Sequence, residues 1–231
     1  MFRFKQFSVA QDKCAMKVGT DGTLLGAWAK AENPKQILDI GTGTGLIAMM
    51  MAQRFENAQV KAIELEINAS QQAAENFQNT RWSNRLIPEH ISLQNFQHTP
   101  SFDLIVSNPP YFENNLKAKK KQRKQARHTD TLSFESLIEY SAKLLSKNGS
   151  LAIILPSENK SKVEKIAKNH ELHINRLCWV KGTEKTIIKR ALLQFSFQKN
   201  RLEETTLIIE KERHVYTEEY TQLCKDFYLK M

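Results

Sequence analysis

Short apolar runs alternate with segments of helical periodicity along most of the chain. The runs predict seven strands, because buried strands of parallel sheets are short apolar stretches between helices. They lie at residues 36–39, 60–64, 90–93, 102–107, 150–155, 174–180 and 190–197. Helices are expected at residues 20–30, 46–54, 67–79, 133–145, 160–169 and 217–229. The pattern predicts an α/β fold with a mostly parallel seven-stranded sheet and helices on both faces.

The 231 residues suffice for one hydrophobic core, and we expect a single domain over residues 1–231. Residues 1–35 form an N-terminal extension, in which the alternation up to about Val18 predicts a short β-ribbon ahead of the first helix. The chain lacks the stretch of about 18 apolar residues that a membrane span needs, and its three cysteines lie far apart. We therefore expect a cytoplasmic protein without membrane contact or disulfide framework. We also expect a monomer.

Most of the positive charge lies in one segment. The net charge is +9, and the basic residues between positions 117 and 127, with no acidic residue among them, account for seven of the nine. They are Lys117, Lys119, Lys120, Lys121, Arg123, Lys124 and Arg127. Such a concentration favours nucleic-acid binding, since each cation placed on a phosphate releases a counterion. A solvated basic loop is the alternative. We expect residues 112–130 to form a basic substrate-binding loop.

A glycine-rich turn follows the first predicted strand. Gly41, Gly43 and Gly45 alternate with threonines and precede a predicted helix, and Asp39 lies just before them. Glycines let the backbone turn sharply and let a ligand approach the main chain. Leu46 stands where a dinucleotide-binding fingerprint has its third glycine, and the lysine of a P-loop is absent. The pattern resembles the first motif of class I S-adenosylmethionine-dependent methyltransferases. The resemblance implies that Asp39 and the glycines bind S-adenosylmethionine.

The second predicted strand ends in a carboxylate. Glu64 lies 19 residues beyond Gly45, and acids at such positions accept ribose hydroxyls in nucleotide-binding relatives of this fold. We expect Glu64 to bind the cofactor ribose; a strand-end glutamate that only faces water is the alternative. Class I methyltransferases, which this chain resembles, usually have an acid after the third strand that binds the adenine amine of the cofactor. This chain has Asn95 there instead, as the candidate acceptor.

The fourth predicted strand ends in Asn108-Pro109-Pro110-Tyr111. Open α/β sheets bind ligands at the carboxyl ends of their strands, so this tetrapeptide should face the same pocket as the glycine turn, with Asn108 also contacting the cofactor. An adenine or carboxamide amine is a poor nucleophile because its lone pair is delocalised. The Asn108 side-chain oxygen and the Pro109 carbonyl can accept its hydrogens, and the two prolines hold these acceptors in place. Tyr111 offers a flat face for a flipped base.

Neither a metal nor a covalent enzyme intermediate is expected. In-line transfer of a methyl group from a sulfonium needs neither, and the proton can leave the amine afterwards. Methylation of a pyrimidine carbon requires a cysteine nucleophile near the pocket, and none of Cys14, Cys178 and Cys224 follows a strand-end proline. His170 and His173 lie three residues apart, but no convincing further ligands accompany them.

The substrate amine has several possible sources. Asn-Pro-Pro-Tyr is shared by adenine-N6 methyltransferases that act on DNA or RNA and by enzymes that methylate glutamine in release factors. The basic segment starts six residues after Tyr111, at the rim of the expected pocket, which favours nucleic acid. The glutamine-methylating family carries a helical domain before its glycine turn, and the 38 residues before Asp39 are too few for it. A non-catalytic RNA-binding module is a third alternative, against which the intact motifs argue.

Five further segments narrow the resemblance to the bacterial tRNA1(Val) adenine-N6 methyltransferases. They are FKQF at 4–7, CAMKVGTDG at 14–22, LLGAW at 24–28, ARH at 126–128 and LSF at 132–134. The resemblance covers essentially the whole chain. It implies transfer of a methyl group from S-adenosylmethionine to N6 of adenine 37, next to the anticodon of a valine tRNA. It also implies that the region around Lys17, Thr20 and Asp21 closes the cofactor pocket.

Overall fold

The apolar runs meet in one central sheet in the computed structural model, which describes residues 1–14, 16–99, 101–110 and 132–231. The sheet has eight strands in the order β10-β8-β9-β7-β6-β3-β4-β5. In chain order these are β3 (Gln36–Ile40), β4 (Gln59–Glu64), β5 (Leu86–His90), β6 (Phe102–Ser107), β7 (Leu145–Pro156), β8 (His173–Lys181), β9 (Ile188–Ser196) and β10 (Glu203–Ile208).

Most neighbouring strands of this sheet are parallel. Of the eight strands, β9 alone runs in the opposite direction, paired antiparallel with β7 on one side and β8 on the other. The other strand pairs along the sheet are parallel. The carboxyl ends of β3, β4, β6 and β7 therefore lie at the same end of the sheet, which is also where β9 begins. This end is called the carboxyl edge below, as distinct from the outermost strands β10 and β5. The predicted mostly parallel α/β sheet is confirmed.

Three strands differ from the sequence prediction, and one of them is β7, which begins at Leu145 rather than at residue 150 because its first half is mostly polar. The sheet has eight strands rather than seven, because the predictions missed β10, which pairs in parallel with β8. Its first four residues are exposed and its sequence is Glu-Glu-Thr-Thr-Leu-Ile, so an edge strand of this kind has no apolar run to reveal it. β5 ends at His90, whereas the prediction placed a strand at 90–93. The apolar residues there, Ile91 and Leu93, belong to the turn that follows β5.

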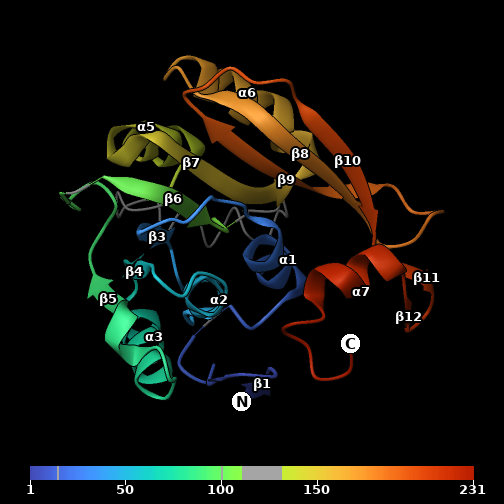
Figure 1. Cartoon of the computed structure of the whole chain (residues 1–231), viewed down its shortest axis with the longest axis horizontal. Coiled ribbons are helices and arrows are strands. Elements are labelled where there is room, and N and C mark those ends of the chain that lie inside the picture. Colours follow the sequence, from blue (N-terminus) through green and yellow to red (C-terminus); the bar gives the residue numbers. More distant parts are fainter. Residues whose placement is uncertain (15, 100, 111–131) are drawn as a thin grey trace, which may run out of the picture.

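The helices cover both faces of the sheet, as predicted. α5 and α6 lie on one face, and α1, α2, α3 and α7 lie on the other (Figure 1). Their bounds are α1 (Thr20–Trp28), α2 (Leu46–Arg54), α3 (Ile67–Gln78), α5 (Phe134–Leu144), α6 (Lys160–Lys168) and α7 (Glu218–Cys224), with single 3-10 turns at Ser83–Arg85 and Ser157–Asn159. Each face has its own hydrophobic cluster of buried side chains.

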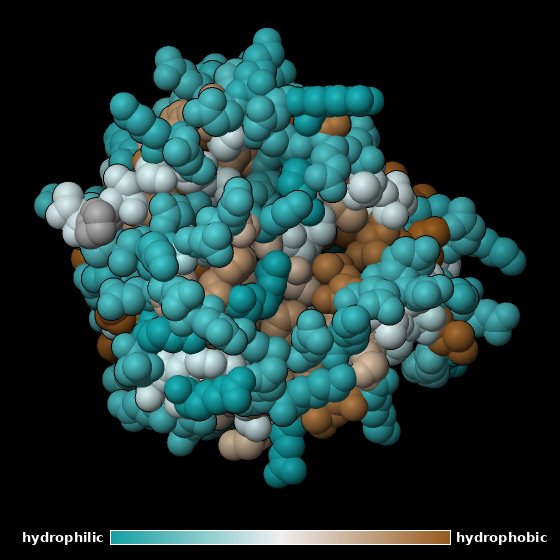
Figure 2. Space-filling model, viewed as in Figure 1, coloured by the Kyte–Doolittle hydropathy of each residue, from teal (hydrophilic) through white to brown (hydrophobic). Residues whose placement is uncertain are grey.

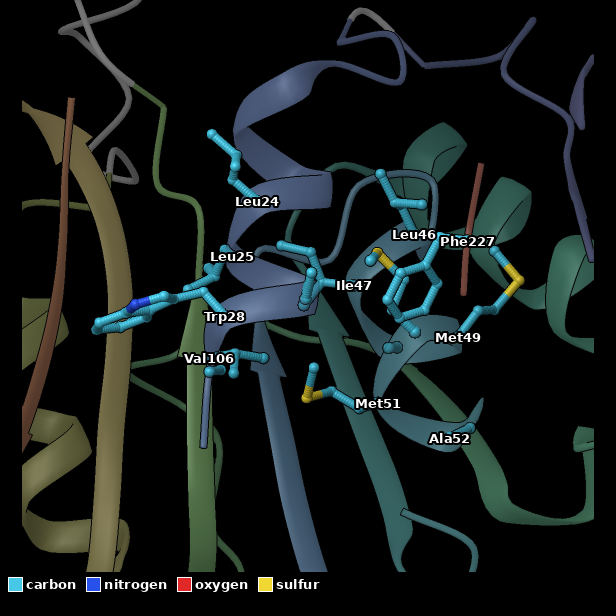
Figure 3. Close-up of a cluster of buried hydrophobic side chains, with 14 of the residues drawn as sticks. Leu24, Leu25, Trp28, Leu46, Ile47, Met49, Met51, Ala52, Val106 and Phe227 are labelled. Carbon is cyan, nitrogen blue, oxygen red and sulfur yellow. The ribbon is translucent and has the colours of Figure 1, made fainter. Parts of the chain in front are cut away.

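The cluster beneath α1 and α2 brings the N-terminal segment up to the sheet. Figure 3 shows Leu24, Leu25 and Trp28 of α1 beside Ile47 of α2, with Val106 of β6 below them. The two helices approach closely because α1 carries glycine at the contact. A Cβ on Gly26 would lie 2.5 Å from the Met50 Sδ. This packing places the start of α1 beside the start of α2, directly after the glycine-rich turn.

The two ends of the chain meet on the α1 side of the molecule (Figure 1). The predicted N-terminal ribbon is present as the antiparallel pair β1 (Phe2–Arg3) and β2 (Ser8–Val9). Phe4 stacks on Tyr228 with ring centroids 5.6 Å apart, and the Lys5 ammonium donates to the carbonyl oxygen of Met231 at 2.6 Å. A second small ribbon, β11 (Glu210–Glu212) and β12 (Val215–Tyr216), follows β10 and was not predicted.

The outer surface seen in Figure 2 is mainly hydrophilic, with hydrophobic residues in separate patches. Within the described ranges, no helix combines the length and the apolar composition needed to cross a bilayer.

Candidate active site

A cavity of about 660 Å³ opens at the carboxyl edge of the sheet. Its walls come from segments that are distant in the sequence. They include Cys14, residues 16–22, residues 40–44, 63–66 and 91–94, and Asn108 with Pro110. The cavity therefore collects the ends of β3, β4, β5 and β6 together with the start of α1, at the edge where ligands bind in open α/β sheets.

The glycine-rich turn forms the floor between β3 and α2. Gly41, Gly43 and Gly45 have φ values of 70°, 56° and 83°, the left-handed region that residues with a Cβ rarely adopt. A Cβ on Gly41 or Gly43 would meet nothing within 4 Å, whereas a Cβ on Gly45 would lie 2.4 Å from the Phe77 ring. The first two glycines line the cavity and leave space for a ligand against the main chain. The third lets the turn pack against α3.

Asp39 supports this turn from beneath. Its side chain is fully buried, and its Oδ2 accepts hydrogen bonds from the Thr42 hydroxyl at 2.6 Å and from the Ala48 amide at 3.1 Å. Burial raises the pKa of Asp39 to about 7, against the opposing effect of those two bonds. Asp39 and Gly45 are not on the cavity wall, and their contacts hold the turn in shape.

Glu64 reaches the same turn from the end of β4. Its Oε2 accepts from the Gly43 amide at 2.9 Å, and its Oε1 accepts from the Leu65 and Glu66 amides at 2.9 and 3.0 Å. The carboxylate is thus fixed on the cavity wall. Glu66 begins α3, where its side chain accepts from the amides of Asn68 and Ala69.

The turn after β5 lines the cavity with residues other than Asn95, the residue that the sequence predicted there. Ile91, Ser92, Leu93 and Gln94 line the cavity, but Asn95 does not. Sequence reasoning missed these four because it placed the strand at 90–93, which moved the expected turn toward Asn95. Gln94 carries the same kind of amide group as Asn95 and does line the cavity.

The segment before α1 closes one side of the cavity. Lys17 and the first two residues of α1, Thr20 and Asp21, all line it, and their role toward a cofactor stays a prediction. The Lys17 ammonium donates to the backbone oxygen of Cys14 at 3.0 Å, within its own loop. The Asp21 Oδ2 accepts from the Arg190 Nε at 2.7 Å. Arg190 lies on β9, an interior strand of the sheet, and no local sequence pattern points to this ion pair.

Cys14 is the cysteine nearest to this chemistry. It lines the cavity but its side chain is buried. Burial, reinforced by the negative charges of Glu64 and Glu66, raises the pKa of its thiol to about 11. A thiol of that pKa is protonated at neutral pH and is a poor nucleophile. Cys14 is therefore a wall residue, in agreement with the absence of a covalent step in the expected chemistry.

Asn108 and Pro110 place the end of β6 on the cavity wall. The Ser107 hydroxyl donates to the Ile40 carbonyl at 2.8 Å, which ties the end of β6 to the end of β3. Pro109 between them is buried. Tyr111 and the seven basic residues from Lys117 to Arg127 lie outside the described residues, so their expected roles stay predictions.

The cavity suits a nucleoside-sized ligand. Its walls join apolar side chains, among them Ile40, Ile63 and Leu93, to a fixed carboxylate and an open stretch of main chain. An apolar slot accepts the flat face of a base, and a carboxylate accepts the hydroxyls of a sugar.

The chain is similar to characterised families along its whole length. A family model described as "Methyltransferase small domain" matches residues 16–176. A tRNA1(Val) (adenine(37)-N6)-methyltransferase of Flavobacterium psychrophilum is 50% identical over 100% of both chains. The protein of the same name from Christiangramia forsetii is 48% identical over 100% of this chain and 98% of its own. The structure of a predicted O-methyltransferase from Agrobacterium tumefaciens superposes with a TM-score of 0.69 at 19% identity, over 90% of this chain and 96% of that one.

The fold, the glycine-rich turn and the cavity at the carboxyl edge define a class I methyltransferase, as the sequence predicted. Full-length identity near one half places the chain more narrowly: it belongs to the methyltransferase small domain family and, within it, to the family of the tRNA1(Val) (adenine(37)-N6)-methyltransferases.

Proposed function

We propose that this protein transfers a methyl group from S-adenosylmethionine to N6 of adenine 37 in tRNA1(Val). The observation that carries the proposal is the position of Asn108 and Pro110 on the wall of the same cavity as the glycine-rich turn and Glu64. A methyl donor held by the turn and an amine held by the end of β6 would therefore meet in one space. The names of the full-length relatives support tRNA as the substrate.

The cofactor site is assigned from the residues on the cavity wall. Glu64 accepts hydrogen bonds from the ribose hydroxyls. To do so, its Oε2 gives up the hydrogen bond that it accepts from the Gly43 amide. The open main chain of Gly41 and Gly43 accommodates the rest of the nucleoside side of the cofactor. Gln94 and Ser92 offer polar groups to the adenine amine beside the apolar side chains of the wall. When bound, S-adenosylmethionine supplies a methyl group on a sulfonium.

The end of β6 prepares the amine. The Asn108 side-chain oxygen and the Pro109 carbonyl accept the two amine hydrogens and direct the nitrogen lone pair toward the methyl carbon. With the amine held in this way, transfer of the methyl group to nitrogen would leave the electron pair of the broken C–S bond on sulfur, and the amine proton would leave to water. Pro109 and Pro110 fix the backbone that carries both acceptors. Tyr111 stacks on the flipped base, and the 112–130 loop contacts the RNA phosphates.

The experiment is methyl transfer from labelled S-adenosylmethionine to tRNA that lacks its own modification, followed by nucleoside analysis. N6-methyladenosine at position 37 of one valine tRNA is the expected result. Wild-type protein that binds the cofactor and labels release-factor glutamine, ribosomal RNA or DNA instead would replace the proposed substrate with that one. Failure to bind the cofactor would favour a non-catalytic RNA-binding module.

A further inference from the structure

A basic hairpin stands beside the cavity and is not explained by the chemistry above. Residues 181–190, here called the 181–190 hairpin, join the end of β8 to the start of β9 (Figure 1). Because β8 runs parallel to β7 and β9 returns from the same edge, the hairpin projects from the edge of the sheet that carries the cavity. It carries four cations and one acid, a net charge of +3 within ten residues.

The hairpin is fastened to the cavity rim at its β9 end. The Arg190 guanidinium donates to Asp21, a wall residue of the cavity, at 2.7 Å. The Ser157 hydroxyl, directly after β7, donates to the Ile188 carbonyl at 2.9 Å. Within the turn, the Thr186 hydroxyl donates to the Thr183 carbonyl at 2.8 Å and accepts from the Thr183 amide at 2.9 Å. The hairpin is therefore a preorganised feature of the rim.

The exposed side of the hairpin combines apolar and basic side chains. Ile187 is 77% exposed and Ile188 is 37% exposed. Lys185 and Lys189 flank this pair and are exposed as well. Two neighbouring isoleucines in solvent leave apolar area that a partner would cover, and lysines on both sides select a partner with negative charge.

We propose that the 181–190 hairpin is a docking surface for the RNA that surrounds the target adenine. This inference rests on the proposed function. When a base is flipped into the cavity, the RNA backbone that carries it lies along the rim. Phosphates of that backbone then contact Lys185 and Lys189, and a neighbouring sugar or base packs on Ile187. Its residues are distinct from the basic segment at 112–130, so substitutions in the hairpin test it independently of that segment.

The test measures the Kd for unmodified tRNA1(Val) over a series of salt concentrations. The variant Lys185→Gln/Lys189→Gln removes two phosphate contacts. Each contact contributes about 0.7–0.9 to the slope of log K against log salt, so the slope falls by about 1.5 and the Kd at about 0.15 M salt rises roughly 20-fold. Ile187→Ser raises the Kd about fivefold with an unchanged slope, because it removes only apolar contact.

The matched control is Lys147→Gln/Lys199→Gln. Both lysines are exposed, and they lie near the start of β7 and after the end of β9, at the opposite edge of the sheet. This control changes the net charge equally and should leave the salt slope as in wild-type protein. Affinity for S-adenosylmethionine, measured by calorimetry, stays within twofold in all three variants and shows that the fold and cofactor site are intact.

A Kd and a salt slope equal to those of the control would overturn the docking surface. A wild-type dimer in sedimentation that Ile187→Ser converts to a monomer would also overturn it, because that result would assign the isoleucines to contact with a second copy of the chain. The proposed function is decided separately, by methyl transfer from the wild-type protein to tRNA. Wild-type protein that binds tRNA without methylating it would refute the proposed function and still allow the comparison among variants, whereas wild-type protein that does not bind tRNA would overturn the docking surface.

Discussion

The glycine-rich turn offers a direct test of how its backbone is maintained, because two of its glycines share a left-handed backbone conformation but are packed differently. Gly41 and Gly45 have similar positive φ values, 70° and 83°. Alanine at either position carries about 1–2 kcal/mol of left-handed backbone strain. Only at Gly45 does the new Cβ also collide, at 2.4 Å from the Phe77 ring, and overpacking in a filled core costs about 1–3 kcal/mol more.

We therefore expect Gly41→Ala to lower the free energy of unfolding by about 1–2 kcal/mol and Gly45→Ala by about 2–5 kcal/mol. Urea titration of the cofactor-free protein at one pH measures both values from the transition midpoints. A third variant isolates the collision. In Gly45→Ala/Phe77→Leu the smaller side chain gives the Cβ room, so the double variant should be more stable than the sum of the single effects predicts.

Two results would refute this reasoning. Equal destabilisation by Gly41→Ala and Gly45→Ala would mean that backbone strain alone determines the cost and that α3 yields freely. Strict additivity in the double variant would mean that the Phe77 ring is not the obstacle at Gly45.

Three further predictions concern the chemistry of the site. Asn108→Ala should lower kcat about 100-fold or more while S-adenosylmethionine affinity, measured by calorimetry, changes only a few-fold; loss of cofactor binding instead would contradict its role toward the amine. Burial raises the pKa of Asp39 from its ordinary 3.8 to about 7, so ionisation opposes folding. Wild-type stability is favoured below about pH 4 and falls by up to about 1.4 kcal/mol per unit as the pH rises toward 7. Asp39→Asn should remove this slope in urea titrations at pH 5 and 7, and an identical slope in both proteins would contradict it. With its thiol pKa raised to about 11, Cys14 should react with iodoacetamide at pH 8 at least about 100-fold more slowly than a free cysteine, as followed by mass spectrometry of the peptide; rapid alkylation would disprove a buried, protonated thiol.

The interior of the sheet was predictable because its strands are buried on both faces. β6 and the second half of β7, from Leu151 on, appear in the sequence as apolar runs, and burial on both faces requires that pattern. The edges were not predictable on the same basis. β10 has four exposed residues out of six and is defined by its pairing with β8. At the other edge, β5 contains Pro88 and an exposed Ile87, so the apolar signal was displaced into the turn that follows.

The site shows the same division between local and long-range information. Gly41, Gly43, Glu64 and Asn108 could be identified because each lies at or shortly after the end of a strand whose own pattern is clear, and the structure brings all four to one cavity. The displaced β5 caused the preference for Asn95 over Gln94. The strand itself was misplaced in register, because an exposed edge strand carries little apolar pattern and the apolar residues of the following turn were assigned to it.

The pairing of Asp21 with Arg190 lies beyond any local pattern, because 169 residues separate the two in the chain. Two long-range events bring them together. The close contact of α1 with α2 at Gly26 places Asp21 on the rim, and the insertion of β9 between β7 and β8 makes Arg190 an interior-strand residue at the cavity edge. A sequence pattern can show that a charged residue lies at the end of a strand. The order of the strands in the sheet determines which residue of opposite charge lies beside it. In this protein, wall residues such as Gly41, Glu64 and Asn108 can therefore be located from sequence motifs. The rim around the Asp21–Arg190 pair can be located only from the order of the strands.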